Sequence, residues 1–244
     1  MSLNPLLTKL SAFADIGEDD ARALEWLCTN VTTHKAKSDL IREGDRPESV
    51  FLILDGWAMR YKLLPDGSRH IMAFLVPGDL CDVHVFILKA MDHNIGLLSE
   101  ARVAAIPKEK MLALVDERPR LTQALWWSSL VDDSILREWL VNMGQRDARE
   151  RIAHLLVEMW WRLRAIGRVD YHAIDLPLTQ QDLADTMGLT PIHVNRILQQ
   201  LRAEGLVELN HRKLRIPDIE RLSAMSGFNP NYLHLDRRLR AAEA

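Results

Sequence analysis

The sequence predicts an α+β protein in which a β-rich N-terminal part is followed by a long helix and a mainly helical C-terminal part. Three observations support this prediction. Glycine-containing turns recur every eleven or twelve residues from Gly44 to Gly78. Residues 120–143 contain neither glycine nor proline, and residues 179–204 show two short helical patterns separated by Gly188. Because each pattern has its own period, we expect three structural units.

The β-rich part extends from about residue 33 to residue 107, where short apolar runs alternate with turn signals. One strand and one turn per interval is typical of an antiparallel jelly roll, so we expect a double-stranded β-helix. We expect helices within residues 1–30 and at 108–116, and a last strand at Ala101–Ile106. The turns are Glu43-Gly44-Asp45, Asp55-Gly56, Asp66-Gly67 and Pro77-Gly78-Asp79. The Asp-Gly pair at 66–67 is the strongest hairpin signal among them.

Pro119 suits the first turn of the long helix, which we expect to span residues 119–143. Residues along it follow the 4-3-4-3-4-3 spacing of a heptad seam that ends at Asn142, with three polar members. We expect this seam to pair two copies of the chain, because a helix that joins two domains has little else to bury. The alternative is an amphipathic helix packed on its own β-rich domain. The residues assigned to the dimer interface are Leu121, Leu125, Ser128, Asp132, Ile135 and Trp139.

Gly144 interrupts the helical pattern, so we place a domain boundary there. The expected units are an N-terminal domain at residues 1–118, the pairing helix at 119–143, and a C-terminal domain at 144–217. A second amphipathic helix is expected at about 146–165. Residues 218–244 form an extension that either packs on the C-terminal domain or binds phosphate.

The composition limits the classes of protein that fit. With 48% hydrophobic residues, the 244-residue chain can build sizeable cores, yet no apolar run approaches a bilayer span. The first residues lack the basic and apolar parts of a signal peptide, and two cysteines are too few for a disulfide framework or an iron–sulfur cluster. We therefore expect a cytoplasmic protein without membrane contact. The net charge of −3 argues against a general polyanion binder, although residues 145–244 hold 15 Lys and Arg against 13 Asp and Glu.

The most informative stretch lies between residues 178 and 205. Thr179 and Asp182 fit a capping box at the start of a two-turn helix, and Gly188 permits a sharp turn after it. Thr190 suits the cap of a second helix, with Pro191 at its first position. Two short helices joined by a tight glycine turn are the signature of a helix-turn-helix, whose second helix enters the major groove of DNA.

The outer face of this second helix is rich in side chains that bind the edges of bases. An ordinary solvated face carries Lys and Glu, whereas this one carries Arg, Asn, Gln and His. Arg196 suits guanine, the amides suit adenine, and Ile192 suits a thymine methyl group. The inner face, expected to be buried, consists of Val194, Ile197, Leu198 and Leu201. The residues expected at the DNA are Thr179, Thr190, Ile192, His193, Asn195, Arg196 and Gln199.

The segment after the second helix predicts a β-hairpin with a basic tip. Leu206–Leu209 and Leu214–Ile216 are the expected strands, and residues 210–213 connect them. A hairpin in this place is a wing. We expect Arg212 and Lys213 to bind phosphates, which position a protein on DNA without specifying the sequence.

Together these motifs resemble the CRP/FNR family (cyclic-AMP receptor protein / fumarate-nitrate reduction regulator) over about residues 13–216. The resemblance rests on the turns at 43–45 and 77–79, the strand Phe51–Gly56, the linking helix and the helix-turn-helix. It implies a cyclic-nucleotide-binding-like jelly-roll sensor domain, a long dimerisation helix, and a winged helix-turn-helix domain that binds a palindromic promoter site. The partners it implies are double-stranded DNA, a second copy of the chain, RNA polymerase and a small-molecule effector.

Two departures from the family concern the sensor. Residues 78–96 contain no arginine for a cyclic phosphate, and the chain has no cysteine cluster, so we expect neither a cyclic nucleotide nor an iron–sulfur centre. The positions that correspond to the family's ligand-binding residues supply the candidate effector residues, while the effector and any cofactor stay unidentified. Alternatives are haem or metal ligation by His84 and His93, a redox switch at Cys81, or no effector at all. The candidates are Asp82, His84, His93 and Asn94.

The sequence therefore predicts a homodimeric, sequence-specific DNA-binding transcription regulator controlled through its N-terminal domain, and it leaves activation or repression open. We expect no catalytic residues, because phosphate-loop, nucleophile-elbow and His-Glu-x-x-His motifs are absent. One alternative is a cupin-like metal enzyme, although His70, His84 and His93 form no His-x-His set, and no metal site is assigned. A second alternative is an interaction module whose helix-turn-helix does not bind DNA.

Overall fold

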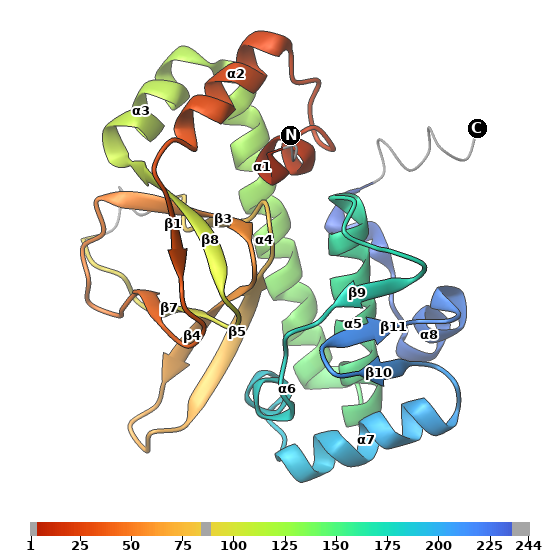
Figure 1. Ribbon diagram of the computed structural model, residues 1–244. Coiled ribbons are helices and arrows are strands. Elements are labelled where there is room, and N and C mark those ends of the chain that lie inside the picture. Colours follow the sequence, from red (N-terminus) through yellow and green to blue (C-terminus); the bar gives the residue numbers. More distant parts are fainter. Residues whose placement is uncertain (1–3, 84–88, 236–244) are drawn as a thin grey trace.

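The computed structural model describes residues 4–83 and 89–235, and its N-terminal domain is a jelly roll (Figure 1). In the described residues, two four-stranded antiparallel sheets have the strand orders β1-β8-β3-β6 and β2-β7-β4-β5. This confirms the double-stranded β-helix, and β4 and β5 form the predicted hairpin around Asp66-Gly67. The strands are β1 Val31–His34, β2 Asp39–Ile41, β3 Ser49–Asp55, β4 Ala58–Leu63, β5 Arg69–Leu75, β6 Leu80–Cys81, β7 Asn94–Leu97 and β8 Ala101–Pro107.

The turn between β3 and β4 shows why the recurring glycines matter. Gly56 has a φ of +82°, a conformation that favours glycine. A Cβ atom at this position would lie 2.2 Å from the carbonyl oxygen of Glu100 and 2.7 Å from the Cα of Ala101. Because both atoms belong to the backbone that leads into β8, they cannot move aside, and the turn requires glycine.

Helices cover one end of the jelly roll and continue into the second domain (Figure 1). They are α1 Pro5–Leu10, α2 Glu18–Leu27, α3 Lys108–Glu117, the long α4 Pro119–Gln145 and α5 Ala148–Ala165. The prediction that Gly144 ends the long helix is wrong, because α4 continues to Gln145. An internal glycine costs a helix only about 1 kcal/mol. The stronger boundary signal is Asp147, which forms a complete capping box with Glu150 and begins α5.

The C-terminal domain combines α5 with the two predicted short helices, α6 Gln180–Met187 and α7 Pro191–Ala203. The predicted hairpin forms from β10 Glu208–Asn210 and β11 Lys213–Arg215. β11 also pairs with β9 Ala173–Asp175, a strand that the sequence analysis did not predict. Three residues are too few for a strand pattern, and β9 reaches its partner only through a long-range pairing.

Most of the extension after residue 217 packs on the C-terminal domain and on α4. It forms α8 Ile219–Ser226 and a short 3-10 helix, Pro230–Leu233. The rings of Phe228 and Tyr232 lie against the buried ring of His154, with centroids 5.0 and 6.0 Å away. The imidazole Nδ1 of His154 is 3.1 Å from the Asn142 amide of α4, so this ring cluster joins α4, α5 and the extension. The basic residues at 237–240 lie outside the described residues.

The buried His154 predicts a stability that is sensitive to acid. Burial, aided by the nearby charge of Arg146, lowers the pKa of His154 to about 3, whereas histidine in an unfolded chain has a pKa of about 6.5. Between these values the unfolded chain binds a proton that the folded chain does not. The free energy of unfolding therefore falls as the pH drops below about 6.5, by about 1.4 kcal/mol per pH unit from this group. Urea denaturation between about pH 7 and pH 5 measures this slope.

The variant His154→Gln, which keeps an acceptor for Asn142, is expected to have a flatter slope than the wild type. Other titrating groups are common to both proteins, so their contribution cancels in the comparison. Equal slopes would assign the acid response to other groups.

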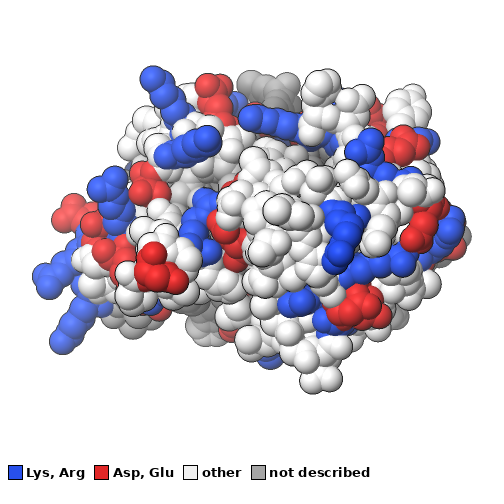
Figure 2. All heavy atoms as spheres, turned by 90° about the horizontal axis from the view of Figure 1, so that it is seen from below, with Lys and Arg blue, Asp and Glu red and all other residues white. Residues whose placement is uncertain are grey.

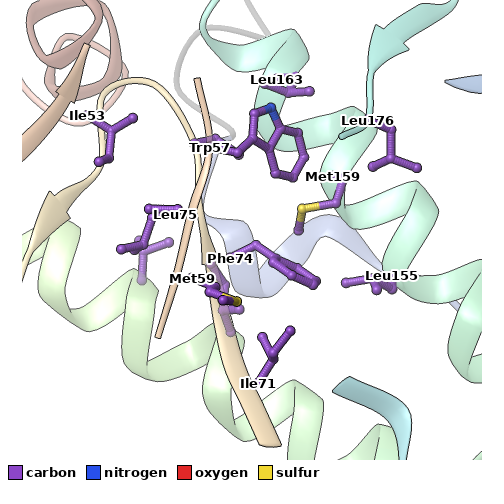
Figure 3. Close-up of a cluster of buried hydrophobic side chains, with 14 of the residues drawn as sticks. Ile53, Trp57, Met59, Ile71, Phe74, Leu75, Leu155, Met159, Leu163 and Leu176 are labelled. Atoms are coloured by element: carbon purple, nitrogen blue, oxygen red, sulfur yellow. The ribbon is translucent and has the colours of Figure 1, made fainter. Parts of the chain in front are cut away.

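The two domains pack against each other through an apolar cluster between the β4–β5 hairpin and α5. In Figure 3, Met59, Ile71 and Phe74 of the hairpin lie opposite Leu155 and Met159 of α5. Phe74 also meets the ring of Trp139 in α4 edge-on, with centroids 5.8 Å apart. The position of the C-terminal domain is thus tied to this hairpin.

Across the part of the chain that the structure describes, no helix has the length and apolarity needed to cross a membrane.

Candidate nucleic-acid interface

The geometry of α6 and α7 is that of a helix-turn-helix with both helix starts capped. The Oγ1 of Thr179 accepts from the backbone N of Asp182 at 3.1 Å, and the Asp182 carboxylate accepts from the backbone N of Thr179 at 2.9 Å. Gly188 ends α6 in the left-handed region, at a φ of +62°. The Oγ1 of Thr190 then accepts from the backbone N of His193 and begins α7. The predicted capping residues are confirmed in these roles.

The two faces of α7 differ as predicted. The inner face is buried, with Val194, Ile197, Leu198 and Leu201 all at most 7% exposed. On the outer face Ile192 is 83% exposed, Arg196 and Gln199 are exposed, and His193 and Asn195 are half-buried. Figure 2 views this end of the molecule and shows Lys and Arg dispersed among Asp and Glu. Polar side chains that can bind base edges, and not an unbroken basic band, therefore characterise this surface.

The side chain of Asn195 is oriented by the preceding helix. Gln180, the first residue of α6, donates from its Nε2 to the Oδ1 of Asn195 at 3.1 Å. Gln180, Asn195, Gln199 and Arg202 line a hollow between α6, α7 and the hairpin, together with His211. Gln180 carries no sequence signal of this role, because only the packing of α6 on α7 brings it to the outer face.

The two basic residues of the hairpin have different surroundings. Lys213 is exposed on β11, at the start of the strand. Arg212 instead lines a cleft between the domains, together with Asp55 and Glu100 of the N-terminal domain. Both cations are exposed, but Arg212 shares its cleft with acidic residues that no local sequence pattern indicated.

The candidate effector residues Asp82 and His93 belong to one charged cluster inside the jelly roll. The Nε2 of His93 lies 2.9 Å from Asp82, whose other carboxylate oxygen lies 3.2 Å from the Nε of Arg60 in β4. Arg60 also reaches Asp132 of α4, at 3.5 Å. Burial lowers the pKa of His93, but the hydrogen bonds to Asp82 and Asp92 outweigh burial and raise it above its usual value. The cluster therefore links the jelly roll to α4.

Arg60 lies outside residues 78–96, the segment that corresponds to the family's phosphate-binding arginine. β4 carries two charged residues, Arg60 and Lys62, so no local signal distinguishes Arg60. Since Arg60 already contacts two carboxylates, an anionic ligand would have to compete with both of them.

The other candidates in this region have different roles or places. Asn94 is a structural residue, because its Oδ1 accepts from the backbone N of Glu43 and its Nδ2 donates to the carbonyl of Tyr61. His84 lies outside the described residues. Cys81 is fully buried, and burial raises the pKa of its thiol, which disfavours the reactive thiolate. Among the residues that the structure describes, no three His, Cys, Asp or Glu side chains are arranged to hold a metal ion.

The predicted seam on α4 requires a correction. Its side chains face the interior of their own chain: five of the six are at most 7% exposed, and Asp132 is half-buried beside Arg60. The alternative, an amphipathic helix packed on its own domain, describes this face. The intrachain set is Leu121, Leu125, Ser128, Asp132, Ile135 and Trp139.

A second apolar face of α4 is exposed. Trp126 is 64% exposed, Leu130 60% and Leu140 67%, and Leu136 and Met143 lie near them in the helix. On the 4-3-4-3-4 positions that begin at residue 126, Trp126, Leu130 and Leu140 are large and apolar, whereas Asp133, Arg137 and Gly144 are not. We refer to Trp126, Leu130, Leu136, Leu140 and Met143 as the exposed α4 face. Several large apolar side chains exposed along one helix are typical of a surface that binds a protein partner.

Comparison with known proteins shows two domain families in this chain. Residues 31–118 match the cyclic nucleotide-binding domain, and residues 150–225 match the Crp-like helix-turn-helix domain. The nitrogen fixation regulation protein FixK of Bradyrhizobium diazoefficiens is 30% identical over 187 residues, which cover 75% of this chain and 76% of that protein. The transcriptional activatory protein AadR of Rhodopseudomonas palustris is 28% identical over 89% of each chain.

The fold is shared with a solved structure. The structure of FixK2 from Bradyrhizobium japonicum superposes with a TM-score of 0.70 at 24% identity, covering 80% of this chain and 96% of that one. The jelly roll and the helix-turn-helix correspond to the two matching domain families, in the same order along the chain. The long helix α4 connects them. FixK is 30% identical to this chain, and the matched residues cover 76% of FixK. This chain therefore belongs to the CRP/FNR family of DNA-binding transcription regulators.

Proposed function

We propose that this regulator binds a palindromic promoter site as a homodimer, with one α7 helix in the major groove at each half-site. The observation that carries the proposal is the doubly capped helix-turn-helix, whose outer α7 face is open to solvent while its inner face is buried. The exposed α4 face is the surface that we assign to the second copy, because burying its apolar area offsets the cost of association. Because the chain belongs to a family of transcription regulators, we do not retain the metal enzyme as an alternative function.

The residues of the interface are assigned by their chemistry. Arg196 and Gln199, exposed on α7, suit base edges, as does Asn195 once Gln180 has oriented it. Ile192 suits a thymine methyl group, and His193 lies beside it. Thr179, Thr190 and Lys213 suit phosphates, and Arg212 contributes there to the extent that its acidic neighbours allow.

Control is assigned to the N-terminal domain through the cluster of Arg60, Asp82, His93 and Asp132. A signal that moves this cluster moves α4, and α4 carries the proposed dimer surface. An effector acts only if its affinity differs between two arrangements of the chain. The effector is unidentified, and RNA polymerase is the proposed protein partner at the promoter. Because promoter DNA is its ligand, we place the protein's action in the cytoplasm.

The test of the proposed function is selection of bound sites from random DNA, followed by affinity measurements with Arg196→Ala. We expect a palindromic site and a loss of about 1–3 kcal/mol at one base pair per half-site, with relaxed preference there. Lys213→Ala is the matched comparison, because it should weaken all sequences alike and lower the salt slope by about one. An equal loss on every sequence with Arg196→Ala would assign that residue to phosphate. Failure to select any site would favour the interaction module.

A further inference from the structure

The β4–β5 hairpin of the N-terminal domain touches the helix-turn-helix directly. Arg69, the first residue of β5, donates from its Nη2 to Asp182 at 2.6 Å and from its Nε to Asp185 at 2.7 Å. The three side chains are 25%, 10% and 12% exposed, so water screens the contact only in part. One guanidinium thus holds two carboxylates of α6 across the boundary between the domains.

Each of the two carboxylates also accepts hydrogen bonds from its own domain, which fixes its orientation toward Arg69. Asp182 uses its Oδ2 to close the capping box with Thr179, which leaves its Oδ1 for Arg69. Asp185 uses its Oδ1 to accept from Gln181 at 2.6 Å, which leaves its Oδ2. Because α6 packs on α7 through the tight turn at Gly188, the orientation of α6 sets the orientation of α7.

The other strand of the same hairpin holds the charged cluster of the jelly roll. β4 and β5 pair with Leu63 opposite Arg69 and with Arg60 opposite Ala73. Arg60 contacts Asp82 and Asp132, so one hairpin reaches both the candidate sensing cluster and α6. The same hairpin packs on α5 through Met59, Ile71 and Phe74 (Figure 3).

We propose that Arg69, although it lies in the sensor domain, is a positioning residue for DNA recognition. It holds α6, and with it α7, at the angle that sets the distance between the two recognition helices of a dimer. In the same structure the outer face of α7 is open to solvent, with Ile192 83% exposed. The contact of Arg69 with α6 therefore orients that face and does not cover it. Losing the contact should therefore weaken binding to the two-half-site operator, where relative orientation matters.

The inference rests on the proposed function, and its test uses the operator that the selection experiment yields. We measure affinity for that operator, for versions with the half-sites moved by one base pair in either direction, and for an isolated half-site. For Arg69→Ala we expect a loss of about tenfold on the natural spacing, within the usual range of coupling between sites. We also expect a flatter spacing profile and an unchanged half-site affinity. The control Arg42→Ala removes an exposed arginine of the same domain and should behave as the wild type.

A charge exchange separates positioning from a general structural role. Arg69→Asp should lose the spacing preference, and adding Asp185→Arg should restore it, because the ion pair re-forms with its polarity reversed. Asp182 is left intact in both, since it caps α6. An Arg69→Ala protein with wild-type affinity and spacing profile would overturn the proposal. So would an equal loss on the isolated half-site, which would place Arg69 at the DNA itself.

Hydrogen exchange of α6 in the DNA-free protein keeps this test separate from the proposed function. Faster exchange of α6 in Arg69→Ala than in Arg42→Ala is expected whether or not an operator is found. Equal exchange in the two variants would overturn the contact. Failure of the wild type to select any operator would instead count against the proposed function.

Discussion

Replacing Leu140 with aspartate is expected to convert the proposed dimer into monomers. Leu140 is 67% exposed and lies on the exposed α4 face with Trp126 and Leu130, so the substitution removes little packing within its own chain. In a dimer paired along this face, the carboxylate would be buried without a partner at the helix contact, which costs several kcal/mol. Light scattering after size-exclusion chromatography measures the change in mass.

DNA binding should fall together with dimerisation. A monomer binds one half-site and loses the gain of linked binding, which amounts to roughly 10²-fold or more. The matched control is Leu112→Asp, which places the same change at an exposed leucine of α3 and should leave mass and affinity unaltered. If Leu140→Asp stayed dimeric, the exposed α4 face would not be the interface, and a different surface would have to hold the two copies.

The long helix shows why a heptad pattern cannot by itself identify a dimer surface. α4 has large apolar residues on two sides, and the side that follows the regular heptad spacing packs on the chain's own domains. Each side contains leucines and a tryptophan, Trp139 on the buried side and Trp126 on the exposed side, so composition does not distinguish them. The polar residue Asp132 belongs to the inner side because Arg60 compensates it, and no local pattern could indicate a partner 72 positions away.

The helix-turn-helix was predictable for the opposite reason, because its signals are local. The capping box, the glycine turn and the apolar inner face each involve residues within a few positions of one another, and all three agree. The contacts that tie this motif to the rest of the molecule are not local. Arg69 lies 113 residues before Asp182, and β9 meets β11 about forty residues later, so neither has a signature in the linear sequence.

A large loss of stability is the expected result of replacing Asp79 with alanine. Asp79 is 2% exposed and binds Lys9 of α1 and Arg162 of α5, each at 2.8 Å. Arg162 also donates to the carbonyl of Phe74 at 2.9 Å, so the cation is held at the boundary of the two domains. Removing the carboxylate leaves the largely buried Lys9 without its partner and Arg162 with Glu158 alone, at 3.4 Å, and breaking such a buried group typically costs about 3–5 kcal/mol. Chemical denaturation at neutral pH measures the loss.

The matched control is Asp55→Ala, which also removes an aspartate paired with an arginine across the domains. Asp55 and Arg168 are 54% and 46% exposed and 3.4 Å apart, and exposed pairs of this kind contribute at most about 1 kcal/mol. A similar loss from both variants would show that burial does not decide the contribution of these pairs. A loss below 1 kcal/mol from Asp79→Ala would contradict the prediction outright.

The pH dependence of the wild type provides an independent check on Asp79. Burial alone would raise the pKa of its carboxyl, but Lys9 and Arg162 outweigh burial and hold the pKa below its usual value. A lowered folded-state pKa means that the unfolded chain binds the proton first, so the contribution of Asp79 is complete above about pH 4, the ordinary aspartate value, and is lost as the pH falls through the folded-state pKa. The buried His154 acts from about pH 6.5 down to about pH 3, so it acts alone of the two above about pH 4 and together with Asp79 below that value. Asp79→Ala should flatten the pH dependence below about pH 4 and leave the slope above it unchanged. Because the Asp79 carboxylate joins α1, the jelly roll and α5, the difference between the variant and the wild type reports on the boundary between the domains.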